Sequence, residues 1–224
     1  IQSGRQQAAV AHELDEQWDE KNPRPLTEPA EGTAFARLYI PSFGSDFNFS
    51  VVKGVADEDL TKGPGHYQDS QDPGKPGNFA MAGHRVGRGS PFNDLGLLKT
   101  CDSVVVETAG NWNIYRVMPI DVDPGSRKAE AEKCMPPELA QKMAEGEYAG
   151  VNGRYITTPN DISVINPIPG QQRIEAKPED AALLTMTTCH PQFSNKERMI
   201  VHAVLVRSEP KQGGQLPQEL TEGS

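Results

Sequence analysis

Long apolar runs and basic residues are both scarce in this sequence, and each scarcity excludes a class of protein. No apolar stretch approaches the roughly 18 residues that a membrane-spanning helix needs. Acidic residues outnumber basic residues by 31 to 22, which gives a net charge of −9. Because a nucleic-acid-binding protein needs a basic surface, this balance argues against that class. More than half of the net charge lies between residues 12 and 31, and we interpret it as an aid to solubility.

A starting methionine is also missing, because the chain begins at Ile1. We therefore expect that a signal peptide or a membrane anchor has been removed from in front of these residues. The three cysteines, which amount to one pair and one further thiol, leave the redox compartment open.

Glycine and proline, by contrast, are abundant, with 21 and 19 residues spaced between short apolar runs. This spacing favours an all-β domain with many turns over a helical bundle. A chain of 224 residues suffices for one such domain with appendages. We expect residues 35–209 to form the domain and residues 210–224 to be a disordered tail. Residues 1–34 are interpreted as an acidic linker or stalk with a helical stretch, and an arm docked on the domain is the alternative.

Apolar runs between turn signals locate the expected elements. A hairpin turn is expected at Ala109–Asn111, an irregular loop over Pro64–Gly77 and a helix over Pro136–Glu147. The expected strands are Ala36–Ile40, Phe49–Val55, Phe79–Ala82, Ser103–Thr108, Trp112–Met118, Leu183–Cys189 and Met199–Arg207.

Cys189 stands where an apolar strand ends and a polar, proline-containing segment begins. A cysteine kept for packing is expected inside a strand, whereas one at a strand end can meet a substrate. Position alone leaves both interpretations open. A catalytic thiol also needs a base or proton donor nearby, because a free thiol is mostly neutral at pH 7.

The sequence offers five histidines for that role. His84 is the strongest candidate, because it follows the short strand Phe79–Ala82 at the start of a glycine-rich segment. The others are His12 in the N-terminal segment, His66 in a loop as a weaker candidate, His190 beside Cys189 but directed to the opposite strand face, and His202 in mid-strand, where a satisfied core residue is expected.

Acyl transfer also needs a group that stabilises a developing oxyanion. Arg198 lies nine residues after Cys189, at the start of the next expected strand. If these two strands are neighbours, both side chains meet at one rim, where a guanidinium suits a carbonyl oxygen or an oxyanion. An arginine at a strand start is, by itself, usually only solvated.

These segments resemble the signature of a known enzyme family. Thr185–Cys189 (Thr-Met-Thr-Thr-Cys), followed by Arg198, is similar to the sortase motif Thr-Leu-x-Thr-Cys with its strand-borne arginine. Phe79–Arg85 resembles the sortase histidine segment. Further segments resemble class E, the actinobacterial housekeeping type of sortase: Asp57–Leu60, Lys62–Tyr67, Gly77–Phe79, Cys189–Pro191 and Lys196–Ala203.

The resemblance runs from about Phe35 to Arg207 and implies a closed eight-stranded β-barrel with short helices. It implies Cys189 as nucleophile, His84 as acid and base, and Arg198 as electrostatic stabiliser. The implied reaction cleaves a secreted protein at a C-terminal sorting signal of the Leu-Ala-x-Thr-Gly type. A thioester then transfers the protein to the amine of a cell-wall precursor of the lipid II type. Neither a metal nor an organic cofactor is implied, and the implied location is the extracellular face of the plasma membrane.

Two other classes remain as alternatives. Another cysteine acyl transferase, such as an L,D-transpeptidase, carries Ser-His-Gly-Cys at its nucleophile, and Thr-Thr-Cys-His does not match that pattern. The second alternative is a catalytically inactive extracellular β-barrel that binds a partner.

The resemblance also suggests where the substrate binds. It places the recognition tyrosine of class E at Tyr67, whose phenol can hydrogen-bond to the peptide backbone beside an apolar ring face. The alternative is that Tyr67 has only a structural role and holds its loop in place. We add Thr187 and Thr188 from the cysteine motif as candidate substrate-binding residues.

Two departures from the family pattern stand out. Met186 replaces the usual leucine, which is a volume-conserving change. Residues 126–153 form a longer connection than is usual and carry Cys134. Because Cys189 must stay free to react, we expect Cys101 and Cys134 to form a disulfide, with two separate buried thiols as the alternative.

Overall fold

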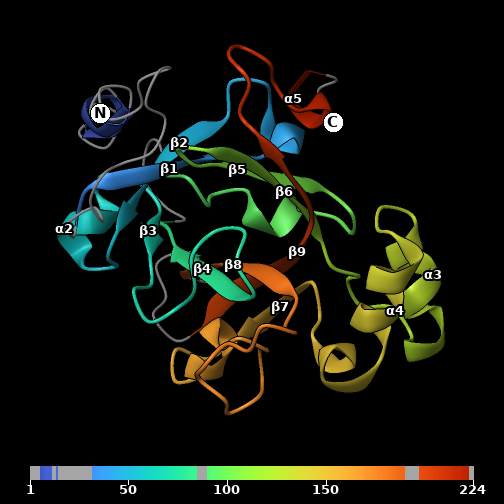
Figure 1. The fold of residues 1–224 in the computed structure, drawn as a ribbon. Helices are drawn as coiled ribbons and strands as arrows, with labels where there is room; N and C mark the ends of the chain where they lie inside the picture. Colours follow the sequence, from blue (N-terminus) through green and yellow to red (C-terminus); the bar gives the residue numbers. More distant parts are fainter. Residues whose placement is uncertain (1–5, 12–13, 15–31, 85–89, 190–196, 222–224) are drawn as a thin grey trace.

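The computed structural model describes residues 6–11, 14, 32–84, 90–189 and 197–221, and its strands form one mixed sheet (Figure 1). The strands are β1 (Ala34–Tyr39), β2 (Asn48–Lys53), β3 (Gly65–His66), β4 (Gly77–Ala82), β5 (Ser103–Glu107), β6 (Asn111–Val117), β7 (Arg154–Thr157), β8 (Ala182–Cys189) and β9 (Arg198–Pro210). The α-helices are α2 (Asp57–Leu60), α3 (Arg127–Glu132), α4 (Pro137–Ala144) and α5 (Gln218–Thr221). The 3-10 helices are η1 (Pro41–Phe43), η2 (Leu95–Leu97), η3 (Pro124–Ser126), η4 (Gly146–Gly150) and η5 (Ile162–Ile165). Among the described residues, no helix is both long enough and apolar enough to cross a bilayer.

The sheet closes on itself. Its strand order is β6-β5-β1-β2-β3-β4-β8-β9-β7, and β6 pairs in addition with β9. This pairing closes eight strands into a barrel, while β7 is added along the first residues of β9. The closed eight-stranded barrel predicted from the sequence is confirmed.

Each strand expected from the sequence is present, with ends that shift by a few residues. Two strands were not expected. β3 has only two residues and lies inside the expected irregular loop, where Val52 of β2 pairs with Gly65. β7 is short and only partly buried, so its residues carry no alternating pattern.

Alternate residues of the strands fill the barrel. Leu184 and Met186 of β8 pack in one core cluster with Phe79 and Met81 of β4, and all four are fully buried. Met186 thus fills a core position, as expected for a flexible apolar side chain that is similar in volume to leucine. Thr185 lies between these two core residues and points to the opposite face of the sheet.

The described residues of the N-terminal segment contact the barrel. Val10 and Leu14 are buried against Ala34 and Val52. The Gln7 side chain hydrogen-bonds to the N–H of Ser50 and to the C=O of Lys62. Our interpretation of this segment as a linker is therefore wrong for residues 6–11 and 14, which form the docked arm named as the alternative.

The expectation of disorder after Pro210 is also wrong for residues 211–221, which include α5. Glu219 is only 7% exposed, and its two carboxylate oxygens accept hydrogen bonds from Arg207 at 2.7 and 2.6 Å. Leu220 packs against the cluster around Trp112. A bidentate ion pair and an apolar contact thus hold a segment whose composition suggested disorder.

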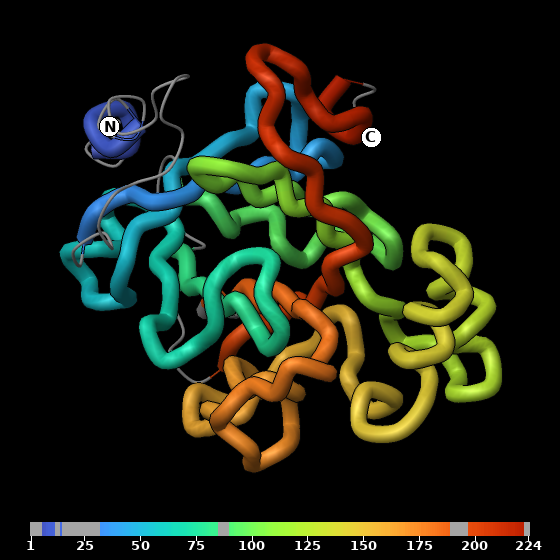
Figure 2. The backbone as a smooth tube through the Cα atoms, viewed as in Figure 1, coloured from blue at the N-terminus to red at the C-terminus, as the bar shows by residue number. Residues whose placement is uncertain are grey.

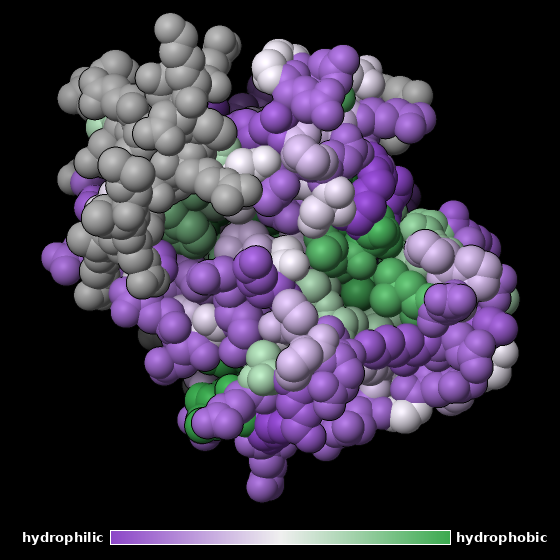
Figure 3. Space-filling model, in the orientation of Figure 1, coloured by the Kyte–Doolittle hydropathy of each residue, from purple (hydrophilic) through white to green (hydrophobic). Residues whose placement is uncertain are grey.

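Residues 123–151 form a small helical lobe beside the barrel (Figure 2). α4 confirms the first part of the expected helix, whereas η4 replaces its end and α3 was not expected. Apolar residues gather where the lobe meets the barrel (Figure 3). A buried cluster shared by the lobe and the barrel consists of Met118, Ala131, Met135, Ala140, Met143, Tyr148, Val151, Ile168, Ala181, Leu183 and Val204.

One buried cation organises the lobe. The Arg127 guanidinium donates to the carbonyls of Met143, Tyr148 and Val151, with a distance of 2.7 Å from Nε to the Met143 oxygen. These carbonyls lie near the C-terminal ends of α4 and η4, where backbone oxygens lack helical partners and favour a positive charge. Arg127 thereby joins three segments of the lobe through main-chain acceptors.

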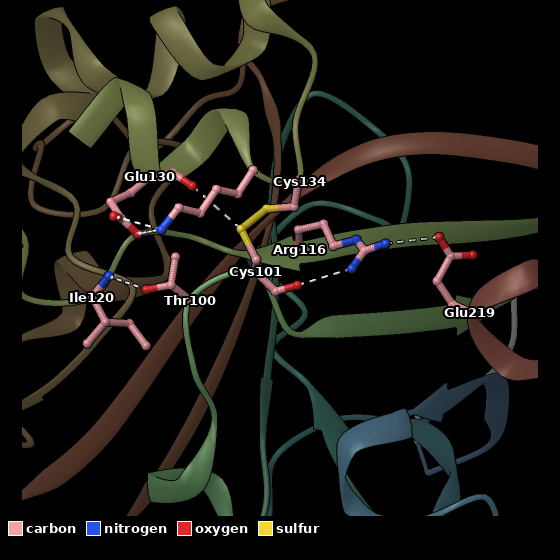
Figure 4. The surroundings of a disulfide bond; sticks show 8 residues. Thr100, Cys101, Arg116, Ile120, Glu130, Cys134 and Glu219 are labelled. Atoms are coloured by element: carbon pink, nitrogen blue, oxygen red, sulfur yellow. Dashed lines mark hydrogen bonds and ion pairs between the residues drawn. A yellow bond between two sulfur atoms is a disulfide. The ribbon is translucent and has the colours of Figure 1, made fainter. Parts of the chain in front are cut away.

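A disulfide ties the lobe to the barrel (Figure 4). The Cys101 and Cys134 sulfurs lie 2.10 Å apart and the two Cα atoms 5.7 Å apart, as in the pairing that we expected. The carbonyl of Cys101 accepts a hydrogen bond from Arg116 at 3.2 Å, and Arg116 also pairs with Glu219. The attachment point of the lobe is therefore linked to the C-terminal helix as well.

We predict that removing this bond destabilises the protein measurably. The bond spans a sequence separation of 33 residues, so its loss should lower the free energy of unfolding by about 3–4 kcal/mol on the chain-entropy model. Denaturant unfolding of a Cys101→Ser, Cys134→Ser double variant against the wild type measures this loss. Alkylation of all three cysteines under denaturing conditions without reductant, detected by intact mass, would show that the bond does not form.

Candidate active site

The ends of three neighbouring strands meet at one rim of the barrel. β4 and β8 are parallel, with Ala82 opposite Thr187, so both end at the same edge. The N–H of Gly83 donates to the Thr187 carbonyl at 3.1 Å, which continues the pairing past Ala82. His84 follows two residues after Ala82, as Cys189 follows two residues after Thr187.

The third strand is β9, which runs antiparallel to β8. Arg198 at its start is paired with Cys189 on one side and with Thr157 of β7 on the other. Residues directly opposite each other in an antiparallel pair share a face of the sheet. Cys189 and Arg198 are thus direct neighbours across β8 and β9, and His84 follows two residues after the end of the adjacent strand β4.

A close contact explains the glycine before His84. A Cβ atom at Gly83 would lie 2.5 Å from the Phe92 ring, which is closer than a side chain tolerates. The N–H of Phe92 donates to the His84 carbonyl at 3.0 Å. Phe92 therefore fixes the backbone around His84, whose side chain is half-buried. The Cys189 side chain and residues 85–89 and 190–196, with His190, lie outside the described residues.

The three candidate substrate-binding residues do not all come together. The Tyr67 hydroxyl lies 2.9 Å from Oγ1 of Thr187, on the face of β8 away from the barrel core. Thr188 points to the other face, is 2% exposed, and its Oγ1 has no hydrogen-bond partner among the described residues. The structure therefore groups Tyr67 with Thr187 and leaves Thr188 apart.

Of the remaining histidines, His66 and His202 are buried, and His12 is outside the described residues. His66 packs between the rings of Phe35 and Phe79, and burial lowers its pKa. His202 is fully buried, as expected for a satisfied core histidine, and burial lowers its pKa to about 3.

His202 belongs to a polar cluster that sequence reasoning did not find. Its Nε2 lies 2.8 Å from the Tyr155 hydroxyl and its Nδ1 lies 2.7 Å from Oγ1 of Thr185. Thr185 in turn donates to Oδ1 of Asn78 at 2.8 Å. A polar residue between apolar residues of a strand, such as Thr185 or His202, is the signal that could have revealed the cluster. Within the described residues, no group of three or more His, Cys, Asp or Glu side chains is arranged to hold a metal.

Comparison with known proteins gives a consistent picture. The family described as "Sortase domain" matches residues 38–206. The chain is 28% identical over 222 residues to sortase SrtE1 of Streptomyces coelicolor, and this match covers 96% of the chain but 52% of that protein. The chain therefore spans about half the length of this curated relative.

Solved structures agree in fold. The SrtF sortase from Corynebacterium diphtheriae shares 55% identity at a TM-score of 0.86, over 90% of this chain and 98% of that one. Sortase E from Streptomyces avermitilis shares 32% identity at a TM-score of 0.60, over 86% of this chain and 99% of that one.

The buried histidine predicts how stability depends on pH. The pKa of His202 is about 3 in the folded protein and about 6.5 when unfolded. Between these values the unfolded chain binds a proton that the folded protein does not. The free energy of unfolding should therefore be highest above about pH 6.5 and fall toward pH 3, by up to about 1.4 kcal/mol per pH unit from this residue. His66 adds a loss of the same sign.

Denaturant unfolding of the wild type and of His202→Gln at about pH 7.5, 5.5 and 4.5 measures this slope. The variant lacks the titrating group, so its loss of stability on acidification should be smaller than that of the wild type. Equal slopes for the two proteins would contradict the assignment.

Proposed function

Because the chain belongs to the sortase family, whose members are generally cysteine transpeptidases, we propose that it cleaves a sorting signal of the Leu-Ala-x-Thr-Gly type between Thr and Gly. It then joins the released protein to the amine of a cell-wall precursor. The observation that carries this proposal is the register of β4, β8 and β9. In that register Cys189 is paired with Arg198, and β4 ends beside β8 two residues before His84.

The chemistry follows from the three residue types. The Cys189 sulfur attacks the carbonyl carbon of the signal threonine, so a carbon–sulfur bond forms and the peptide C–N bond breaks. His84 gives a proton to the leaving glycine amine. The precursor amine then attacks the thioester, and its proton returns to the enzyme as the thiolate leaves.

Arg198 has a distinct role in this scheme. Negative charge develops on the threonine carbonyl oxygen in both steps, and a planar guanidinium can donate two hydrogen bonds to it. Its main chain is paired on both sides, to Cys189 and to Thr157, so the base of the side chain is held in place. A rigid base limits the reorganisation needed as charge develops.

The finer class and the location are part of the proposal. The motifs around Tyr67 and Cys189 and the match to SrtE1 support class E, although the structure that shares 55% identity carries the name SrtF. We place the reaction at the extracellular face of the plasma membrane. There the Cys101–Cys134 disulfide would persist.

The three rim residues should be separately essential. We expect Cys189→Ala to abolish thioester formation and His84→Ala to slow cleavage by about 10²–10⁴-fold. Arg198→Lys should slow it by roughly 10²-fold, because a point charge cannot replace the planar donor pair. Mass spectrometry of a Leu-Ala-x-Thr-Gly peptide incubated with protein and an amine measures all three.

Arg173→Lys provides the matched control, since Arg173 pairs with Asp180 in the connection before β8. It should retain the wild-type rate. Cleavage at a near-wild-type rate by any of the three rim variants would contradict the assignment of these residues as catalytic.

Tyr67→Phe should change substrate preference rather than chemistry. The variant keeps the ring and loses the hydroxyl that lies 2.9 Å from Thr187. We expect it to discriminate less between Ala and Pro at the second signal position, by roughly tenfold or less, while Cys189 remains equally reactive toward a small alkylating agent. Competition between the two peptides measures this, and an unchanged preference would count against a recognition role.

A further inference from the structure

The polar cluster around His202 connects the strands of the candidate site on the outer face of the barrel. Asn78 lies on β4, Thr185 on β8, His202 on β9 and Tyr155 on β7. Thr185 and His202 are directly paired in the sheet. The side chains of Asn78, Thr185 and His202 are fully buried.

The donors and acceptors of this cluster admit one arrangement. The Asn78 amide nitrogen lies 3.1 Å from the Val164 carbonyl and 3.0 Å from the Asn166 carbonyl, so both of its hydrogens are used there. Its Oδ1 can then only accept, and Thr185 must donate to it. The Thr185 oxygen therefore accepts from His202, whose Nδ1 carries the hydrogen.

The remaining step follows from the neutral imidazole. With the hydrogen on Nδ1, the Nε2 atom of His202 can only accept, so Tyr155 donates to it. Burial and the charge of Asp161 raise the pKa of Tyr155, which keeps its hydroxyl protonated. The hydrogen bonds thus run in one direction, from Tyr155 through His202 and Thr185 to Asn78 and the carbonyls at η5.

A second link holds η5 from the other side. Asp161 accepts from Thr157 at 2.8 Å and from Ser163 at 2.6 Å. Thr157 is the β7 residue paired with Arg198. The segment around η5 is therefore attached to β4 through Asn78 and to β7 through Asp161.

We propose that Tyr155 and His202 are positioning residues, which hold β4, β8 and β9 in the register that aligns His84, Cys189 and Arg198. The proposal rests on the proposed transpeptidase function for its catalytic consequence. Thr185 and His202 each lie four residues along their strands from Cys189 and Arg198. Neither is placed to contact the reacting atoms, since four residues of a strand span about 13 Å.

These hydrogen bonds can act at that distance because every buried donor and acceptor in the series from Tyr155 to Asn78 has a partner. A strand shift that lengthens one bond leaves a buried donor or acceptor unpaired, which opposes the shift. Small misplacements of catalytic groups, even from changes far from the chemistry, reduce turnover strongly. The cluster should therefore affect turnover more than substrate binding.

The experiment measures kcat and KM for peptide cleavage by wild type, Tyr155→Phe, Thr185→Val and Thr185→Ser. Rates are compared at a temperature at least about 20 °C below each Tm. Tyr155→Phe and Thr185→Val should lower kcat about tenfold with KM within about twofold. Thr185→Ser keeps the hydroxyl and should restore kcat. Tyr39→Phe is the matched control, because it removes a hydroxyl bonded to Glu107 on the β1–β5 pair.

A kcat that stays unchanged in Tyr155→Phe, despite a lower Tm, would reduce the cluster to a structural role and overturn the proposal. A similar loss of kcat in Tyr39→Phe would overturn it as well. Wild-type protein that cleaves no sorting-signal peptide would instead overturn the proposed function, and with it the catalytic consequence.

Nitrogen NMR of the histidine rings tests the bond direction without any activity. The His202 signals should report a neutral ring with hydrogen on Nδ1 from about pH 8 to about pH 4.5. Hydrogen on Nε2, or a charged ring in that range, would show that the chain of bonds does not run as proposed.

Discussion

The parallel pairing of β4 with β8 is the constraint on which the rest of this structure depends. Parallel strands cannot be joined by a tight turn, so the whole of residues 83–181 serves as the crossover between them. β5, β6, the helical lobe and β7 all belong to that crossover. Because they are parallel, β4 and β8 both end at the same rim of the barrel. A register slip of one residue would turn Thr187 inward and Met186 outward.

The sequence predicted those parts of the fold that follow from local alternation. The main barrel strands and the order of His84, Cys189 and Arg198 could be predicted because each depends on short apolar patterns and strand ends. The docked Gln7 could not, because its partners lie more than 40 residues away on Ser50 and Lys62. The same holds for Glu219, whose burial depends on an arginine of β9.

The candidate site likewise contains residues that local sequence identifies and residues that only the fold identifies. Its rim residues carry recognisable motifs, whereas Asn78 and Tyr155 acquire meaning only from neighbours on other strands. Thr188 shows the converse, since a place next to Cys189 in sequence puts it on the opposite face of β8. Strand geometry thus separates residues that a linear motif groups together.

The disulfide between Cys101 and Cys134 also determines which cysteine can react with a thiol-specific reagent. Both of these thiols are consumed in it, and Cys189 is the remaining cysteine of the three in the sequence. In the oxidised protein, a maleimide-linked fluorophore or spin label therefore has one free thiol to react with, that of Cys189. In a reducing environment the disulfide would be broken, and all three cysteines would be free thiols.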